Sequence, residues 1–235
     1  MRPVFPHRWE LSEQEATTLQ SHLSAFVVTE DRLSQTIRKI AGVDVAYDDG
    51  GPRAYAAISL MDAASGEAER VITATVESPF PYLPGLLSFR EIPALAAAFE
   101  KLDLSPDLVL CDGQGVAHPR GFGLASHLGV LYDLPTIGCA KTRLVGESVD
   151  PGRSRGNWAP ILFAGRLVGA VLRTQDGVKP VYVSPGHRIS ALTACQWVLR
   201  LCRRYRIPEP LRLADQAVNR LKTASRLMPP RRTIA

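Results

Sequence analysis

Three short runs of β-type residues follow one another early in the chain, and they constrain the fold more than any other feature. They cover residues 40–47, 54–61 and 70–76. Asp48-Asp49-Gly50-Gly51 and Ala63-Ala64-Ser65-Gly66 separate them, and both are typical of hairpin turns. Because strands joined by short hairpins pair antiparallel, the pattern predicts a three-stranded antiparallel meander.

A proline-rich stretch at residues 79–85 ends this pattern, and helical and strand-like segments then alternate. In order, they are a helix at 88–102, a strand at 108–111, a helix at 124–132 and a strand at 136–140. Such alternation is typical of parallel strands joined by crossover helices. The sheet is therefore expected to be mixed.

The remaining segments complete a single domain. Residues 12–15 form a capping box at the start of a predicted helix that ends near Ala25. The other predicted elements are a hairpin at 167–173 and 181–184 and two helices at 189–205 and 211–225. We expect one α/β domain over residues 1–225 and a basic tail at 226–235.

Composition favours an ordinary globular protein over a disordered or membrane protein. The chain has 235 residues, of which 46% are hydrophobic and 22% charged, close to the average for globular domains. Its longest apolar stretches, such as 94–99, are far shorter than the roughly 20 residues that span a bilayer. No secretory signal is recognisable at the start. We expect a cytoplasmic protein.

Positive charge is concentrated near the C-terminal end. Residues 200–235 include ten basic and two acidic residues, a net charge of +8, whereas the whole chain carries +5. This segment suggests a polyanion partner, because Lys and Arg that neutralise phosphates release counterions. A solvated helix face is the alternative.

The cysteines argue against a zinc site. Cys111, Cys139, Cys195 and Cys202 each lie in an apolar run, and no Cys-x-x-Cys pair is present. We expect reduced, buried thiols, with a disulfide as the alternative.

Two aspartates stand in strands where a carboxylate is costly unless it is paired or bound to a metal. Asp44 interrupts an apolar strand, and Asp112 ends another just before Gly113 and Gly115. Ligands bind beyond the carboxyl ends of parallel strands, so Asp112 stands in a suitable place. A solvent-facing Asp44 remains the alternative. The glycines allow either close approach of the backbone to a substrate or a tight turn.

Glu91 is a third candidate acid, although Ser88-Phe89-Arg90-Glu91 also matches a capping box. Three carboxylates without a Cys/His cluster favour Mg²⁺ or Mn²⁺ over zinc, and such sites carry out phosphoryl chemistry. Lys141 ends a strand at the same predicted edge as Asp112, where it could stabilise phosphate charge. A solvated strand end is the alternative for this lysine.

The histidines are less informative. His118 follows the glycine loop, and His187 precedes a helix in a region suited to an anion. We expect His7 and His22 at the surface.

Beyond these patterns, the chain resembles the endonuclease V family, the deoxyinosine-directed nucleases of the ribonuclease-H-like fold. The matching segments are residues 42–45, 81–91, 112–115 with 118–120, 135–138 with Lys141, 186–188, and 208–210 through 214–215. The resemblance covers roughly residues 40–215. It implies an α/β ribonuclease-H-like mixed sheet, a three-stranded antiparallel meander plus parallel strands, flanked by helices.

The resemblance also implies roles for individual residues. Asp44, Glu91 and Asp112 would ligate Mg²⁺, with Mn²⁺ as a substitute, and Asp215 would be a fourth acid or base. Lys141 would support the attacking water or the phosphate. Tyr82 would wedge into the duplex while the deaminated base turns out into a pocket. The implied DNA- and lesion-binding residues are Pro81, Tyr82, Leu83, Pro84, Gly85, Leu87, Gly113 and His118.

The implied function is a DNA repair endonuclease. It would hydrolyse the second phosphodiester bond 3′ to deoxyinosine and leave 3′-hydroxyl and 5′-phosphate ends. The expected partner is damaged double-stranded DNA, or single-stranded DNA or RNA that contains inosine. No membrane partner is expected, and the protein would be a monomer. Two residues depart from the family pattern: Gln114 stands where many relatives have His, and Asp215 where some have His.

Three alternatives remain. An inosine-specific endoribonuclease would use the same acids on single-stranded RNA, and contacts to the 2′-hydroxyl would distinguish it. A non-catalytic nucleic-acid-binding module would have little reason to keep three such acids. A nicotinamide-dependent dehydrogenase is disfavoured, because His118 occupies the third glycine position of the dinucleotide-binding motif.

Overall fold

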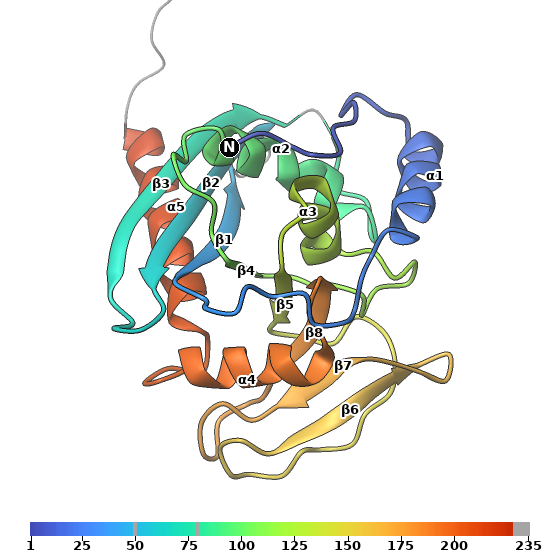
Figure 1. Ribbon diagram of the computed structural model, residues 1–235. Helices are drawn as coiled ribbons and strands as arrows, with labels where there is room; N and C mark the ends of the chain where they lie inside the picture. Colours follow the sequence, from blue (N-terminus) through green and yellow to red (C-terminus); the bar gives the residue numbers. More distant parts are fainter. Residues whose placement is uncertain (49–50, 79, 228–235) are drawn as a thin grey trace, which may run out of the picture.

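The computed structural model describes residues 1–48, 51–78 and 80–227, and within these residues eight strands form one mixed sheet (Figure 1). The strands are β1 (Lys39–Tyr47), β2 (Arg53–Asp62), β3 (Ala68–Glu77), β4 (Leu108–Cys111), β5 (Thr136–Ala140), β6 (Trp158–Phe163), β7 (Arg166–Leu172) and β8 (Val181–His187). Their spatial order is β3-β2-β1-β4-β5-β8-β7-β6. β1 to β3 form the predicted antiparallel meander, and β1, β4 and β5 are parallel. The prediction of a mixed α/β sheet is confirmed.

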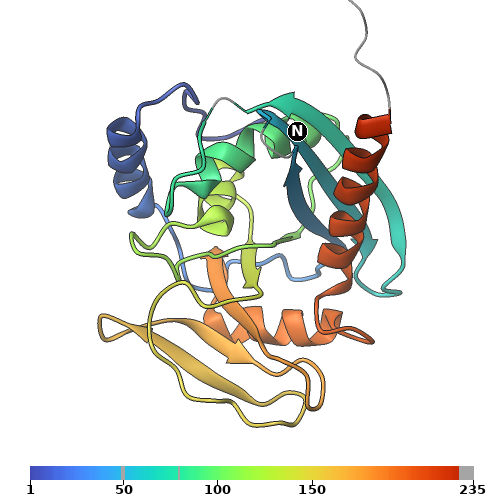
Figure 2. The same cartoon turned by 180° about the vertical axis from the view of Figure 1, so that it is seen from behind.

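Helices cover both faces of the sheet. They are α1 (Glu13–Ser24), α2 (Leu87–Phe99), α3 (Leu124–Tyr132), α4 (Ala191–Leu201) and α5 (Glu209–Leu227). On one face, α2 and α3 pack against β1 and β4 through a large apolar cluster that contains Val43, Ile92 and Leu128. On the other face, a second cluster joins α4 and the start of α5 to the sheet. Figure 2, seen from behind, shows α5 lying across β1 and β2.

Local sequence accounts for several boundaries. Ser12 and Glu15 form the predicted capping box at the start of α1. The helix at 124–132 and the strands at 108–111 and 136–140 are found where the pattern placed them. The turn residues Asp49 and Gly50, as well as Pro79, lie outside the described residues.

Other predictions about secondary structure were wrong in instructive ways. Strand β6 was missed, since it lies at the sheet edge and contains Pro160, which usually argues against a strand. Helix α4 ends at Leu201 rather than near 205. Helix α5 continues through Leu227, so the predicted tail at 226–235 begins within it, and residues 228–235 lie outside the description.

Two general expectations can also be compared with the structure. All four cysteines are free and buried, as predicted, and the disulfide alternative is wrong. None of the helices in the described part of the chain has the length and apolar character needed to cross a bilayer.

Candidate active site

Asp44 lies in the middle of β1 and points to the face covered by α5. Residues 42, 44 and 46 alternate toward this face, where Ala46 packs on the cluster around Ala214 of α5. A side chain at position 42 would clash with α5, because an added Cβ would stand 2.3 Å from the carbonyl carbon of Pro210. Helix α5 therefore approaches β1 closely, and the same helix carries Asp215.

Asp112 lies beside Asp44 because β1 and β4 run parallel. Val43 is in register with Cys111, so the next residues on each strand are neighbours, and the Asp112 amide donates to the Val43 carbonyl at 3.4 Å. Lys141, directly after β5, donates from Nζ to Asp112 Oδ2 at 2.6 Å. The sheet thus brings the predicted lysine and both aspartates to one edge.

The electrostatics place Asp215 and Glu91 in the same group. Burial, followed by the negative charges of Asp112 and Asp215, raises the pKa of Asp44 to about 7. Burial, followed by the charges of Asp44 and Asp112, raises the pKa of Glu91 well above its usual value. Burial lowers the pKa of Lys141, but its hydrogen bond to Asp112 and the other nearby carboxylates outweigh this, so the net shift is upward. Four acids and one lysine therefore influence one another.

Glu91 does not cap a helix, so the capping interpretation of Ser88 and Glu91 is wrong. Helix α2 begins after Leu86 without a side-chain cap, and Glu91 lies within it at 8% exposure. Ser88 shares a hydrogen bond with His127 instead. Burial of Glu91 in this position has no local explanation and strengthens its assignment to the acidic site.

The chemistry of these donors fits a hard divalent cation. Carboxylate oxygens are the ligands that Mg²⁺ and Mn²⁺ prefer, and buried acids that repel one another gain from a shared cation. Among residues 1–48, 51–78 and 80–227, no three His, Cys, Asp or Glu side chains already form an array that would hold an ion. Metal binding stays a proposal.

The proline-rich loop presents Tyr82 to solvent. Phe80 is buried against Phe89 and Leu86, whereas Tyr82 is 62% exposed. Pro81 and Pro84 are also exposed, and Leu83 is half-buried against the same cluster. An anchored loop with an exposed aromatic tip fits the predicted wedge.

Gly85 closes this loop in a conformation that favours glycine, with φ of +79°. Its carbonyl accepts from Gln20 Nε2 at 3.0 Å and from Arg120 Nη2 at 2.7 Å. Gln20 also donates to the Phe122 carbonyl at 2.7 Å and accepts from Arg120 Nε. No local pattern in the sequence signals Gln20, because a glutamine among polar helix residues resembles a solvated side chain. Gln20 holds the loop through hydrogen bonds to residues far away in the sequence, which only the folded structure brings together.

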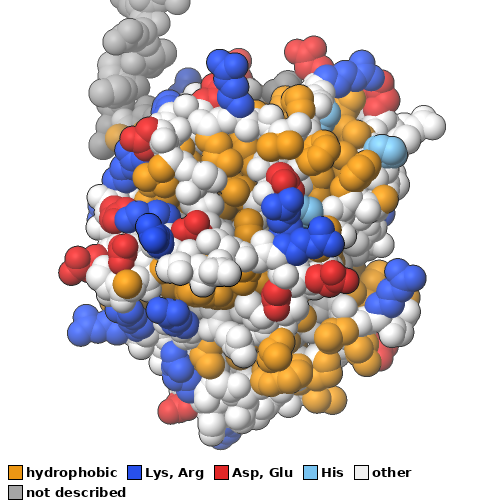
Figure 3. Space-filling view, in the orientation of Figure 1, with side chains coloured by type: hydrophobic (Ala, Val, Ile, Leu, Met, Phe, Trp, Pro, Cys, Tyr) orange, Lys and Arg blue, Asp and Glu red, His pale blue; other side chains and the backbone are white. Residues whose placement is uncertain are grey.

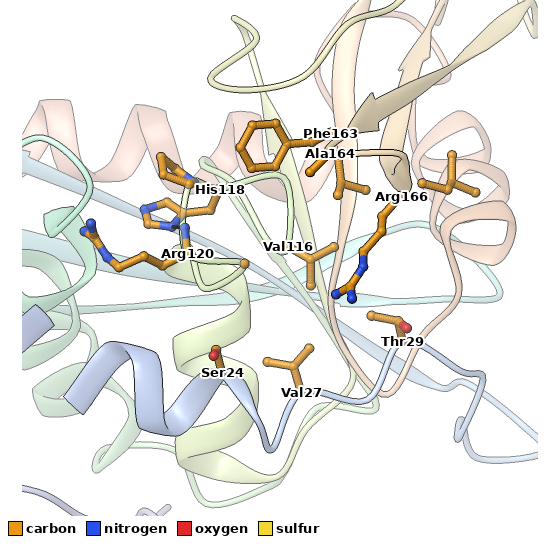
Figure 4. Close-up of a pocket in the computed structure, with 13 residues that line it drawn as sticks. Ser24, Val27, Thr29, Val116, His118, Arg120, Phe163, Ala164 and Arg166 are labelled. Carbon is orange, nitrogen blue, oxygen red and sulfur yellow. Dashed lines mark hydrogen bonds between the residues drawn. The ribbon is translucent and has the colours of Figure 1, made fainter. Parts of the chain in front are cut away.

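His118 lies next to this network. It is buried, and its Nδ1 accepts from the Arg120 amide at 3.2 Å. Burial, together with the Arg120 guanidinium, lowers the pKa of His118 to about 4. A hollow of about 610 Å³ opens on its other side, between the 24–29 segment, the 116–121 loop and the β6–β7 turn. Figure 4 shows Arg166 and Phe163 reaching over this hollow, whereas Arg120 points away from it.

The two glycines after Asp112 differ. A Cβ on Gly113 would only touch Leu124 at 3.4 Å, so Gly113 remains open to a ligand, and the half-buried Leu87 remains available too. A Cβ on Gly115 would stand 1.9 Å from the Pro185 carbonyl oxygen. For Gly115 the close approach is to the backbone of β8. Gln114 donates to the Thr142 carbonyl at 2.9 Å, which ties this loop to the segment after Lys141.

Two predictions for histidines need correction. His7 is not a surface residue: it is half-buried, and its Nε2 lies 2.8 Å from Nε2 of the buried His127. His187 ends β8 and is hydrogen-bonded to Asp133 at 3.3 Å and to the Val28 amide at 3.2 Å. The prospective anion site at His187 is therefore already filled by a carboxylate. His22 is exposed, as predicted.

Comparisons with known proteins match one family along most of the chain. The family model described as Endonuclease V matches residues 21–216. An Endonuclease V of Trichormus variabilis is 47% identical over 211 residues, which are 90% of this chain and 96% of that protein. The Xanthomonas campestris protein of the same name is 47% identical over 218 residues, 93% of this chain and 92% of that one.

Solved structures show the same fold. The crystal structure of Endonuclease V from Streptomyces avermitilis superposes with a TM-score of 0.88 at 48% identity, covering 94% of this chain and 98% of that one. The Ciona intestinalis enzyme, crystallised with a 24mer DNA containing an inosine followed by a ribo-adenosine, has a TM-score of 0.81 at 27% identity, with 91% and 100% covered. Since the family model spans most of the chain and relatives near half identity cover nine-tenths of it, this chain belongs to the endonuclease V family.

Proposed function

We propose that this protein hydrolyses the second phosphodiester bond on the 3′ side of a deaminated base in DNA, with deoxyinosine as the principal lesion and Mg²⁺ as cofactor. One observation carries the proposal: Asp44 in β1, Asp112 after β4 and Lys141 after β5 are neighbours, and Glu91 of α2 interacts electrostatically with both aspartates. Family membership supports the reaction class. The inosine-containing DNA in the Ciona structure supports the choice of lesion.

Asp44, Glu91 and Asp112 would hold the metal ion. When bound, Mg²⁺ supplies charge neutralisation at the phosphate and lowers the pKa of the attacking water. Lys141 has three N–H donors, of which one is used by Asp112, so another can reach a phosphate oxygen. Asp215, whose charge helps to raise the pKa of Asp44, would take a proton from the water. The water oxygen bonds to phosphorus and the P–O3′ bond breaks, which leaves 3′-hydroxyl and 5′-phosphate ends.

Lesion recognition would fall to the opposite side of the site. Tyr82 would insert beside the lesion, where unstacking costs least because the deaminated base pairs poorly. Gly85, Leu87 and Gly113 would offer backbone to the turned-out base, with His118 alongside. Burial keeps His118 neutral at physiological pH, so it would contact the base as a neutral imidazole.

The test is a nicking assay on a duplex with one deoxyinosine, with Mg²⁺ or with chelator, beside the undamaged duplex and a matched inosine RNA. The proposal expects a Mg²⁺-dependent cut one nucleotide beyond the lesion in DNA. A cut in RNA alone would move the function to RNA turnover. Binding without any cut would favour a non-catalytic module.

Two variants separate chemistry from recognition. Asp44→Ala should abolish cleavage and retain lesion binding, whereas Tyr82→Ala should mainly weaken lesion binding, with Tyr82→Phe as the matched control that keeps the ring. Cleavage by the Asp44 variant at the normal rate would contradict the assignment of Asp44 as a metal ligand.

A further inference from the structure

A concave, positively charged pocket lies where α4 ends and α5 begins, next to the β2–β3 turn. It encloses about 230 Å³, and its polar lining is Arg200, Arg203, Arg204, Tyr205, Glu209 and Arg212. These six residues define the arginine pocket. Figure 3 shows Lys and Arg side chains gathered at the lower left, over the α4–α5 connection and the β2–β3 turn.

The structure holds the guanidinium groups in place. Arg203 Nη1 donates to the Ser65 carbonyl at 3.1 Å, and Arg200 Nη2 donates to the Ala63 carbonyl at 3.2 Å. Gly66, with φ of +71°, makes room for this, because an added Cβ would stand 2.5 Å from Arg203 Nη1. Each of these guanidinium groups uses only part of its five N–H donors in the bonds described. The pocket is therefore preorganised and keeps donors for a ligand.

Positive charge in the pocket is not balanced. Arg212 forms an ion pair with Glu209 and stacks over the Tyr205 ring at 4.6 Å. Within the described residues, no carboxylate lies within ion-pair distance of Arg200, Arg203 or Arg204. The single acid of the pocket thus faces four guanidinium groups, and an anion would relieve their repulsion.

The size and chemistry point to one phosphate group. A pocket for a drug-sized ligand encloses roughly 300–1,000 Å³, which is more than this one offers. Guanidinium groups bind phosphate with paired N–H donors and hold it better than point charges do. A phosphodiester group fits within this volume, and its oxygens match the guanidinium donors.

The pocket is connected to the active site by the chain itself. Arg212 precedes Asp215 by three residues of α5, about 4.5 Å along the helix axis. Arg206, in the α4–α5 connection, donates to the Lys141 carbonyl at 3.1 Å. A strand bound at the acids could continue along this connection to the arginine pocket.

We propose that the arginine pocket binds a backbone phosphate of the substrate strand that flanks the cut. The inference rests on the proposed nucleic-acid substrate and explains the basic segment after residue 200. It adds affinity for any sequence and no preference for the lesion, because phosphate contacts carry no sequence information.

The test measures binding of an undamaged duplex at several salt concentrations, by fluorescence anisotropy in the presence of chelator. The variants are Arg204→Ala and the double variant R203A/R204A, and the matched control is R2A/R153A, which removes two exposed arginines elsewhere. The salt slope of log K should become shallower by about 1 for the double variant. The control should change the slope much less.

Several outcomes would overturn the proposal. Equal changes in slope from both double variants would show that only net charge matters. Inorganic phosphate that raises the melting temperature of the wild type but not of R203A/R204A, with an unchanged DNA slope, would assign the pocket to free phosphate. Arg204 has an exposed side chain, so its single variant gives an answer if the double variant does not fold. Because this assay measures DNA binding and not cleavage, its result can be interpreted even if the proposed nuclease activity is wrong.

Discussion

Ser88 and Glu91 stand one turn apart on α2, yet they belong to two opposite kinds of buried polar group. Ser88 donates to His127 Nδ1, His127 Nε2 donates to His7, and His7 Nδ1 donates to the Arg8 carbonyl. The Arg8 carbonyl can only accept a hydrogen bond, so His7 carries its proton on Nδ1 and accepts at Nε2. His127 therefore carries its proton on Nε2 and accepts from Ser88 at Nδ1. Glu91 instead lies near Asp44 and Asp112, whose charges oppose its ionisation. The histidine chain is satisfied by the protein alone, and the acidic group is not.

The difference separates structural from functional polar groups. A buried network in which each donor has an acceptor stabilises one arrangement of the chain. A group of buried like charges costs stability unless something outside the protein compensates it. The acidic group is therefore the one that awaits a ligand. Exchanging single members of each group tests this contrast.

The largest effect is expected for Glu91→Gln. Cleavage should fall by about 10³-fold, because a charged contact to the reacting centre is lost. The metal-free protein should become more stable at pH 8. The raised pKa of Glu91 means that its favourable protonated form is lost as pH rises, and glutamine stays neutral. Nicking rates and thermal melting in chelator measure both effects.

Ser88→Ala is the matched control on the same helix. It should destabilise the protein by about 1–2 kcal/mol, because His127 Nδ1 loses its donor, and leave cleavage within a few-fold. If Glu91→Gln lowered stability as Ser88→Ala does, the distinction between the two groups would fail.

His127→Ala should have the largest effect on stability. The His127 ring is fully buried and packs against Phe89, Phe122 and His7, so its removal leaves a cavity and two unpaired groups. We expect a loss of about 3 kcal/mol in urea unfolding. His22→Ala, which removes an exposed histidine, should cost less than about 0.5 kcal/mol. An unchanged unfolding midpoint for His127→Ala would contradict the structural role.

Gln20→Leu should affect lesion recognition through the Gly85 loop. The variant keeps the volume but leaves the Phe122 carbonyl unpaired and removes one of two donors to the Gly85 carbonyl. We expect the preference for deoxyinosine over undamaged duplex to fall about five- to tenfold, since about 1 kcal/mol of positioning is lost. Gln14→Leu on the exposed face of α1 is the control. The measurement is the ratio of the binding constants for the deoxyinosine duplex and the undamaged duplex, in chelator. An unchanged ratio would show that Gln20 has no part in lesion recognition.

Sequence predicted much of this picture wherever the cause was local. The meander and the parallel strands followed from alternation and turn residues, and Asp44 and Asp112 were found because aspartate is unusual inside a strand. Glu91 was ambiguous, because Ser-x-x-Glu is a local capping pattern and its burial depends on β1 and β4. The pairing of His7 with His127 and of Gln20 with Gly85 joins residues 120 and 65 positions apart, and no local pattern signals such contacts.

The smallest effect concerns pH, where the two groups oppose each other. Burial lowers the pKa values of His7, His118, His127 and His187 below 6.5, so the unfolded chain binds protons first and stability falls as pH drops below about 6.5. The pKa of Asp44 is raised to about 7, so protonation of Asp44 favours the folded state as pH drops from about 7 toward 4. In the metal-free wild type the two trends partly cancel.

Asp44→Asn removes one of the two buried acids, Asp44 and Glu91, whose raised pKa values favour the folded state as pH drops. Its stability should therefore fall more steeply between pH 7 and 5 than that of the wild type, by up to about 1.4 kcal/mol per pH unit. Urea unfolding in chelator at pH 7, 6 and 5 measures the two slopes. Parallel slopes would mean that Asp44 ionises alike in the folded and unfolded chain, and the acidic group would then need no external cation to compensate it.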